Sequence, residues 1–287
     1  MGSKNLPSTI VNQPHQSARS KKPLRQKNFN FEAKAKTMED KLREAAEIIS
    51  NARRVTGFTG AGISVESGIP PFRGEDGLWS QYDPDILLLD NYTQKTKEVW
   101  KVIKKLFFDF FGDARPNAGH EVLAWMEQQG LLADVITQNI DNLHQKAGSR
   151  EVHEFHGNSR QFVCMKCSTR YQRDDIRLTE EPPKCPSCGG LLKPDFIFFG
   201  EPIPTDAYEA SVYDAQHSDV FLIIGTTGNV FPASQVPLLA SQNKARVIEV
   251  NPEESLFTRD ITDVFLQGKA SEVMAQLKKY LQNQINQ

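Results

Sequence analysis

The residues Val55-Thr56-Gly57-Phe58-Thr59-Gly60-Ala61-Gly62-Ile63-Ser64 decide the fold. The first five are mostly β-branched or aromatic, and this composition predicts a short buried strand. Gly60-Ala61-Gly62 then forces a sharp turn, and the backbone amides of such a turn can hold a pyrophosphate. The stretch therefore predicts a nucleotide site at the end of a strand.

The turn departs from the glycine pattern of dehydrogenases. The pattern GxGxxG fails because Val65 stands where the third glycine should be. Pro70-Pro71 also stops the helix that should follow. Hydride transfer is therefore disfavoured, and the loop Gly68–Trp79 is expected to cover a ligand instead.

The rest of the chain alternates helical stretches with apolar strands. An amphipathic helix is expected over Glu39–Arg54, and a closing helix over Ser271–Ile285. Further strands are expected at 134–137, 219–224, 246–250 and 264–266. Near-continuous apolar strands separated by helices are typical of a parallel sheet covered on both faces. The predicted fold class is α/β, with a Rossmann-like parallel sheet domain.

Two segments interrupt this alternation. Residues 80–116 are predicted to be helical and contain the apolar run Phe107–Phe111, and residues 160–194 contain every cysteine. We expect these two insertions to form one smaller domain. The Rossmann-like domain then consists of residues 38–79, 117–159 and 195–287.

Composition sets further bounds on the 287-residue chain. With 39% hydrophobic and 24% charged residues it is typical of a globular protein, and no apolar run approaches the roughly 18 to 20 residues of a membrane span. Residues 1–37 carry eight Lys/Arg against Glu32, a charge of +7; because the whole chain carries −2, the remainder carries −9. This basic tail is expected to be disordered. It has no secretory apolar core, so a cytoplasmic location is expected, with an organelle or the nucleus as the alternative.

The four cysteines form two CxxC pairs separated by 17 residues: Cys164 and Cys167, then Cys185 and Cys188. Two such turns aim four thiolates at one point, where Zn²⁺ binds tetrahedrally with Zn–S distances of about 2.3 Å. Two disulfides or a redox pair are the alternatives, but no export signal or second redox motif supports them. We predict a structural zinc ribbon, because four thiolates leave no open position for activating water.

Polar residues follow the other predicted strands. Gln138-Asn139-Ile140-Asp141, Gly225-Thr226-Thr227 and Asn251 each come directly after one strand. Ligands of open α/β sheets bind at the carboxyl ends of the strands, so these residues should converge on one crevice. Taken singly, each could equally be a helix cap or a turn residue.

Further motifs accompany this crevice: Ser67-Gly68-Ile69-Pro70, Phe72-Arg73-Gly74, His153-Glu154-Phe155-His156-Gly157-Asn158 and Phe198-Phe199-Gly200-Glu201. With Gly60–Ser64 and the four-cysteine insert, they make the chain resemble the sirtuin family from Glu39 to about Leu281. The resemblance implies an NAD-dependent protein-lysine deacylase that releases nicotinamide, the deacylated lysine and an O-acyl-ADP-ribose. NAD is then a co-substrate, and Zn²⁺ is a structural ion.

By motif match, the resemblance implies that His156 and Asn139 are catalytic. The histidine would help a ribose hydroxyl to attack the acyl intermediate, and an imidazole with an unperturbed pKa of about 6.5 suits that task. His153 is the nearest competitor. All the other histidines are expected to be structural or surface residues: His15, His120, His144, His153 and His217.

The resemblance also implies which residues hold the ligands. The predicted NAD-binding residues are Gly60, Ala61, Gly62, Ile63, Ile69, Phe72, Arg73, Gln138, Asn139, Ile140, Asp141, Gly225, Thr226, Thr227 and Asn251. An acyl-lysine protein or peptide is expected to enter as an added strand between Phe196–Glu201 and Gly228–Pro232. Its predicted contacts are Phe199, Gly200, Glu201, Val230 and Phe231.

Two departures from the family pattern bear on the acyl group. Pro71 stands where many sirtuins have an acid, and Gly228-Asn229 where many have a leucine, which favours the branch that includes removers of succinyl and malonyl groups. That branch reads acidic acyl groups with a tyrosine and an arginine, whereas counting from Trp100 gives Ile103 and Leu106. This apolar pair, followed by the Phe107–Phe111 cluster, predicts acetyl or longer apolar acyl chains. A helix shifted by one turn would instead present Lys101, Lys104 or Lys105.

Two rival functions remain at this level. A nucleic-acid-binding module could use the ribbon and the basic tail, but the −9 body counts against it, and no specific nucleic-acid partner is expected. ADP-ribosyl transfer to protein is the rival among enzymes, because other nucleophiles can capture the same activated sugar. No membrane partner is expected, and a monomer is expected.

Overall fold

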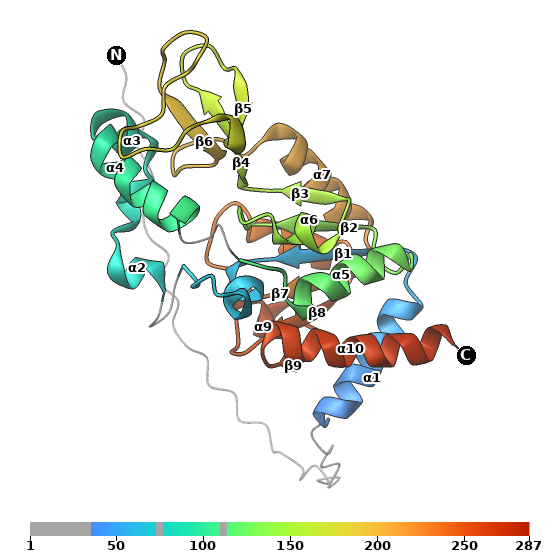
Figure 1. The fold of residues 1–287 in the computed structure, drawn as a ribbon. Coiled ribbons are helices and arrows are strands. Elements are labelled where there is room, and N and C mark those ends of the chain that lie inside the picture. The colour runs from blue at the N-terminus through green and yellow to red at the C-terminus, as the bar shows by residue number, and fades with distance from the viewer. Residues whose placement is uncertain (1–35, 73–76, 110–113, 287) are drawn as a thin grey trace, which may run out of the picture. The chain divides into compact units, whose positions relative to one another are not determined.

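A six-stranded parallel sheet forms the centre of the fold (Figure 1). The computed structural model describes residues 36–72, 77–109 and 114–286, and its sheet has the strand order β3-β2-β1-β7-β8-β9. Every neighbouring pair of strands is parallel, which confirms the predicted α/β class. The strands are β1 Val55–Thr59, β2 Asp134–Thr137, β3 Val152–Glu154, β7 Val220–Ile224, β8 Arg246–Asn251 and β9 Val264–Gln267.

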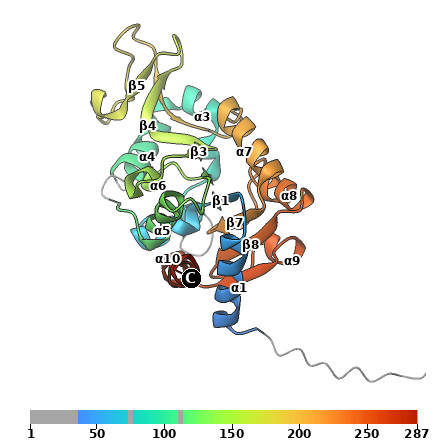
Figure 2. The ribbon, with the colours of Figure 1, turned by 90° about the vertical axis from the view of Figure 1, so that its right-hand side faces the viewer.

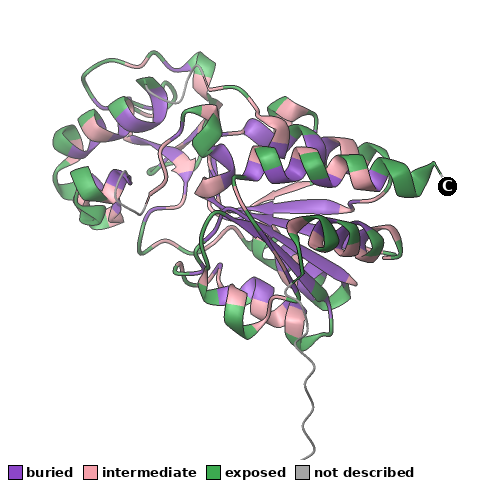
Figure 3. Ribbon diagram, turned by 90° about the horizontal axis from the view of Figure 1, so that it is seen from below, coloured by how far each residue is buried: buried purple, intermediate pink, exposed green. Residues whose placement is uncertain are grey.

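Helices cover both faces of this sheet, as Figures 2 and 3 show. One face carries α1 (Met38–Ser50), α5 (Ala118–Gln128) and α10 (Ala270–Ile285), whose apolar side chains cluster with Val55, Leu222 and Ile248. The other carries α7 (Thr205–His217), α8 (Gln235–Gln242) and α9 (Leu256–Asp260), which cluster with Phe58, Phe221 and Val247. Successive strand residues thus face opposite layers, and this explains why β1 and β7 are buried at every position.

A separate apolar cluster joins the two insertions. Its antiparallel sheet has the order β5-β4-β6, with β4 Gly157–Cys164, β5 Arg170–Gln172 and β6 Leu192–Phe196. Against it lie α2 (Leu78–Gln81), α3 (Leu89–Gln94) and α4 (Thr96–Ile103), which continues as a π-helical turn, Lys104–Asp109. The Tyr92 hydroxyl donates to the carbonyl of Leu192 at 2.6 Å, and the rings of Trp100 and Phe162 lie 6.2 Å apart. The insertions therefore share one core, while the domain boundaries stay a prediction.

Two parts of the fold differ from the sequence expectation. Helix α1 ends at Ser50 rather than Arg54, with Asn51 as its C-cap. The Arg54 guanidinium instead donates to the carboxylates of Asp134 and Asp214 at the amino end of the sheet. The sequence analysis predicts none of the strands β3 to β6, because β3 and β5 have only three residues each, and β4 and β6 contain polar or charged residues such as Arg160 and Lys193.

One short helix and the N-terminal cap of α1 complete the described fold. The short helix α6 spans Leu143–Ala147 and follows β2. Thr37 caps α1 through a capping box with Asp40, whereas residues 1–35 of the predicted tail lie outside the described residues. Among the described residues, no helix is both long and apolar enough to cross a membrane.

Candidate active site

The carboxyl ends of four strands meet at one cleft. The chain order of the sheet reverses between β1 and β7, and ligand crevices form at such a switch point. A cleft of about 890 Å³ lies there, lined by residues that end or follow β1, β2, β7 and β8. Residues from the segments 196–203 and 230–232 line it as well.

Two glycine turns meet backbone against backbone at the floor of this cleft. The amide of Gly62 donates to the carbonyl of Gly225 at 2.8 Å. A Cβ on Gly62 would lie 2.6 Å from the Gly225 Cα, and one on Gly225 would lie 2.3 Å from the Ile63 nitrogen. Gly225 also has a φ of +64°, which favours glycine. Only glycine fits at these two positions. The turns therefore present backbone atoms rather than side chains to a ligand.

Most of the residues predicted to bind the ligands line this cleft. They are Gly60, Ala61, Gly62, Phe72, Gln138, Asn139, Ile140, His156, Phe199, Gly200, Glu201, Gly225, Thr226, Thr227, Val230, Phe231 and Asn251. Three predicted residues do not line it: Ile63 and Ile69 are buried in apolar clusters, and Asp141 is buried beside the lining residues Asn139 and Ile140. Arg73 lies outside the described residues. Val65, Glu66 and Lys269 also line the cleft, although the sequence alone did not indicate them. Trp79, at the end of the loop Gly68–Trp79 that is predicted to cover a ligand, lines it too.

His156 is held at the junction of the two sheets. Its Nδ1 lies 3.0 Å from the carbonyl of Gln138, and because a carbonyl can only accept, Nδ1 must carry the proton and donate. The other ring nitrogen, Nε2, is then an acceptor. Desolvation lowers the pKa of His156 below its ordinary value of 6.5, although the Gln138 hydrogen bond opposes this. The imidazole is therefore neutral at pH 7 and can accept a proton.

Asn139 is fixed by a buried polar network. Its Nδ2 donates to the carbonyl of Gly60 at 3.1 Å and to the hydroxyl of Ser64 at 3.2 Å, which leaves the side-chain oxygen as the free polar atom. Ser64 donates to Asp141 at 2.7 Å, and Asp141 also accepts from the amide of Leu143. Burial raises the pKa of Asp141. Asp141 therefore supports Asn139 through Ser64, a link that the sequence alone does not indicate.

The predicted substrate residues lie on two exposed edges of the cleft. Phe231 is 78% exposed and Phe199 is 44% exposed, so both rings are accessible to a partner. Glu201 instead accepts from the amide of Phe198 at 2.8 Å and pairs with the buried amine of Lys193 at 2.9 Å. Glu201 thus holds the segment in place from behind.

The remaining described histidines lie outside the cleft lining. His120 and His144 are buried, and desolvation lowers the pKa of both, to about 4 for His120. His153 lies 3.3 Å from Asp214, and the hydrogen bond to Asp214 raises its pKa. His217 contacts Tyr213 on the surface of α7. Among the described histidines, only His156 faces the cleft.

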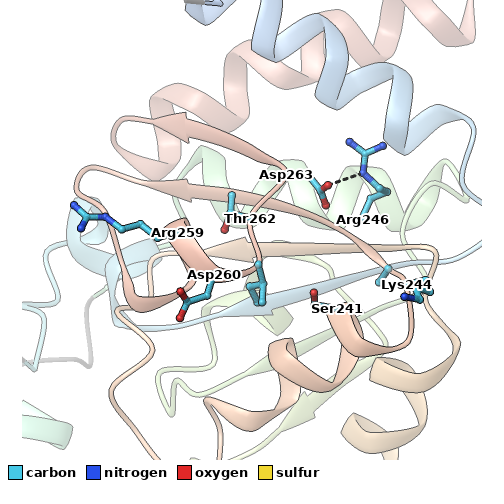
Figure 4. Close-up of a pocket in the computed structure, with 9 residues that line it drawn as sticks. Ser241, Lys244, Arg246, Arg259, Asp260, Thr262 and Asp263 are labelled. Carbon is cyan, nitrogen blue, oxygen red and sulfur yellow. Dashed lines mark ion pairs between the residues drawn. The ribbon is translucent and has the colours of Figure 1, made fainter. Parts of the chain in front are cut away.

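A smaller surface pocket lies beside α8 and α9, but its charged groups do not converge. Figure 4 shows the guanidinium groups of Arg246 and Arg259 pointing in different directions. Arg246 pairs with Asp263 at 3.1 Å, and Arg259 pairs with Glu254 at 2.9 Å. We therefore do not consider this pocket a ligand site.

The four cysteines meet at one point, as their spacing predicts. Their sulfur atoms lie within 4.8 Å of one another, with Cys164 and Cys188 at 3.6 Å and Cys167 and Cys185 at 3.8 Å. Tetrahedral zinc with bonds of about 2.3 Å places its sulfur ligands roughly 3.8 Å apart. The backbone amides of Lys166 and Cys167 donate to the Cys164 sulfur and so help to orient it as a metal ligand. The cluster fits one zinc ion and leaves it no open position.

We expect one zinc ion per chain, and its removal should unfold the small domain. Structural zinc sites contribute on the order of 10 kcal/mol to folding, so Cys185→Ser should abolish stoichiometric zinc and lower the melting temperature sharply. Zinc content by atomic emission and thermal unfolding with and without a chelator measure this. The neighbouring Ser187→Ala is the control and should keep both properties. A zinc-free wild-type chain with an unchanged melting temperature would contradict the assignment.

Known proteins are similar to this chain in sequence and in architecture. The profile of the Sir2 family matches residues 60–232. NAD-dependent protein deacylase 2 of Pyrobaculum aerophilum is 45% identical over 233 residues, which cover 81% of this chain and 92% of that protein. A solved complex of a mutant Sir2 homologue with ADP-ribose has a TM-score of 0.81 and 36% identity, and covers 85% of this chain and 97% of that one.

A second solved structure carries both kinds of ligand. A Sir2–p53 peptide–NAD⁺ complex has a TM-score of 0.77 and 31% identity, and covers 85% of this chain and 99% of that one. The family profile spans the two glycine turns, the histidine and the four cysteines described above. Because sequence, fold and site agree over most of its length, the chain belongs to the Sir2 family.

Proposed function

We propose that this chain is an NAD-dependent protein-lysine deacylase whose acyl channel prefers apolar chains to acidic ones. One observation carries this: a single cleft joins the glycine turns at Gly62 and Gly225 to an imidazole whose Nε2 is free to accept a proton. The products are nicotinamide, the deacylated lysine and an O-acyl-ADP-ribose. The relatives with deacylase names and the ADP-ribose-bound structure support this reaction.

The residue roles belong to this proposal. The turns at Gly60–Gly62 and Gly225–Thr227 would hold the phosphates, and Asn139 would present its side-chain oxygen to the nicotinamide half of NAD. His156 would act as general base on a ribose hydroxyl. The acyl-lysine peptide would lie between the edges marked by Phe199 and Phe231, as strand addition requires. The cytoplasmic location and monomeric state remain predictions from the sequence.

An aromatic wall lines the part of the cleft that we assign to the acyl group. The ring of Phe72 lies 5.3 Å from that of Trp79 and 6.5 Å from that of Phe107, and the ring of Phe107 lies 5.1 Å from that of Phe196. Leu87 also lines the cleft. Among the described lining residues the only Lys or Arg is Lys269, which lies with Ala270 at the start of α10. This wall therefore offers no described cation to an acidic acyl group.

The same preference is predicted from the sequence by Ile103, Leu106 and the Phe107–Phe111 cluster, and only part of this set lines the cleft. Ile103 and Leu106 are buried in the small-domain core and do not line the cleft. Phe107, one residue further on, does. Lys104 is also turned away, because its amine pairs with Asp109 and Glu180. The pair counted from Trp100 therefore belongs to the core rather than to the cleft lining.

Butyryl and succinyl lysine test the preference, because the two chains have equal length and differ in a terminal carboxylate. Burying a carboxylate without a partner costs several kcal/mol, so succinyl should be removed at least about 100-fold more slowly. One peptide carrying each group is incubated with NAD, and nicotinamide release and peptide mass are followed. Faster succinyl removal would overturn the acyl assignment. Nicotinamide release with ADP-ribose added to the peptide would instead indicate ADP-ribosyl transfer.

A further inference from the structure

Glu249 on β8 is a fully buried carboxylate next to the cleft, with 0% of its surface exposed. Within the described part of the chain, no lysine or arginine pairs with it. Its three partners are neutral donors: Asn251 Nδ2 at 2.8 Å, Thr262 Oγ1 at 2.7 Å and Thr258 Oγ1 at 2.9 Å. Burying a carboxylate costs desolvation free energy, and three neutral donors offset it less than a cation would. This cost indicates a role beyond packing.

The carboxylate links the cleft wall to the helix behind it. Asn251 lines the cleft, whereas Glu249 does not. One carboxylate oxygen, Oε1, accepts from Asn251, and the other, Oε2, accepts from Thr258 on α9 and from Thr262 just after it. Residues 249 and 251 share one face of β8 because side chains alternate along a strand.

The hydrogen bonds of Asn251 fix which end of its amide faces the cleft. Its Nδ2 has two hydrogens; one goes to the carbonyl of Thr226 at 3.0 Å and the other to Glu249. Turning the amide over would place its oxygen against two acceptors, the Thr226 carbonyl and the Glu249 carboxylate. The side-chain oxygen is therefore the atom that Asn251 offers to a ligand.

We propose that Glu249 is a positioning residue for the adenosine half of NAD: it holds Asn251 with its carbonyl oxygen toward the cleft. That oxygen accepts from the donors that an adenosine carries, its ribose hydroxyls and its amino group. The inference rests on the proposed function, because it takes NAD as the occupant of the cleft. Glu253 and Ser255 line the same end and add further polar groups.

Replacing Glu249 by methionine removes the acceptor at similar side-chain length. The dissociation constant of ADP-ribose and the KM for NAD should both rise about tenfold, while kcat at saturating NAD stays within twofold. Inhibition by free nicotinamide, which uses the other end of the cleft, should be unchanged. Calorimetric titration with ADP-ribose and steady-state kinetics measure these quantities.

Two matched variants separate positioning from stability. In Glu249→Gln, the amide oxygen can still accept from Asn251, while the amide NH₂ donates to the hydroxyls of Thr258 and Thr262, which can accept. The affinity for ADP-ribose should therefore stay within threefold of the wild type. Thr262→Val removes a donor from the far carboxylate oxygen only, and should also leave the affinity unchanged. If Thr262→Val weakens ADP-ribose as much as Glu249→Met does, Glu249 acts through α9 and the proposal fails.

A double-mutant cycle tests whether the effect runs through Asn251. In an Asn251→Ala background, Glu249→Met should cause no further loss of ADP-ribose affinity; an additive loss overturns the proposal. If Glu249→Met does not fold, Asn251→Asp replaces it in the test. This change places two carboxylates side by side and should weaken the binding of ADP-ribose. Adding Glu249→Gln to Asn251→Asp should then raise the affinity for ADP-ribose at least threefold. Absence of that rescue overturns the proposal. A wild-type chain that does not bind ADP-ribose would instead refute the proposed function.

Discussion

Replacing His156 by alanine should lower the rate of deacylation about a thousandfold, while the affinity for ADP-ribose changes little. A positioned general base contributes roughly 10²- to 10⁴-fold, and among the described histidines no other faces the cleft. Neither Asn139 nor Gln138 can replace it, because an amide is not a base. Deacylated peptide, followed by mass spectrometry, gives the rate, and calorimetric titration gives the affinity.

His153→Ala is the matched control, because this ring comes from the adjoining strand β3 and pairs with Asp214 outside the cleft. It should lower the melting temperature while leaving the rate within about threefold. Equal losses of rate in His156→Ala and His153→Ala would contradict the assignment of His156.

The pH dependence of the wild-type deacylation rate provides a second check. Because desolvation lowers the pKa of His156 below 6.5, the rate should stay constant around pH 7 and fall only when the pH drops below that pKa.

The sequence predicted those parts of the fold that depend on local pattern. The strand Val55–Thr59 was found because its residues are mostly β-branched or aromatic, and the turn Gly60–Gly62 was found because two glycines follow that strand directly. The zinc cluster was found because CxxC spacing fixes thiolate geometry without reference to the rest of the chain. His156 and Asn139 required the family resemblance, since neither residue type is informative alone.

What the sequence did not predict depends on contacts between distant segments. Glu249 appears in a strand as an ordinary acid, and only the fold brings Thr258, Thr262 and Asn251 to it. Ser64 likewise gains its role from Asp141, 77 positions away. Counting from Trp100 likewise cannot show that Ile103 and Leu106 pack into the apolar cluster of the two insertions, whereas Phe107 of the π-helical turn lines the cleft.

Replacing Gly225 by alanine should abolish NAD binding and destabilise the chain by about 2–5 kcal/mol. The new Cβ would lie 2.3 Å from the Ile63 nitrogen and 2.6 Å from the Gly62 carbonyl carbon, so the two glycine turns would have to separate. Overpacking costs about 1–3 kcal/mol, and the left-handed φ of +64° adds about 1–2 kcal/mol. Urea unfolding and ADP-ribose titration measure the two effects.

Gly68→Ala separates the clash from the backbone strain. Gly68 has a similar left-handed φ of +87°, but a Cβ there meets no atom within 4 Å. It should therefore lose about 1–2 kcal/mol and keep its affinity for ADP-ribose. If Gly225→Ala retains that affinity while Gly68→Ala loses it, the close approach of the two turns cannot be what shapes the phosphate end. If only Gly225→Ala loses affinity for ADP-ribose, the phosphates contact the backbone of the two turns, and that contact requires a residue without Cβ at position 225.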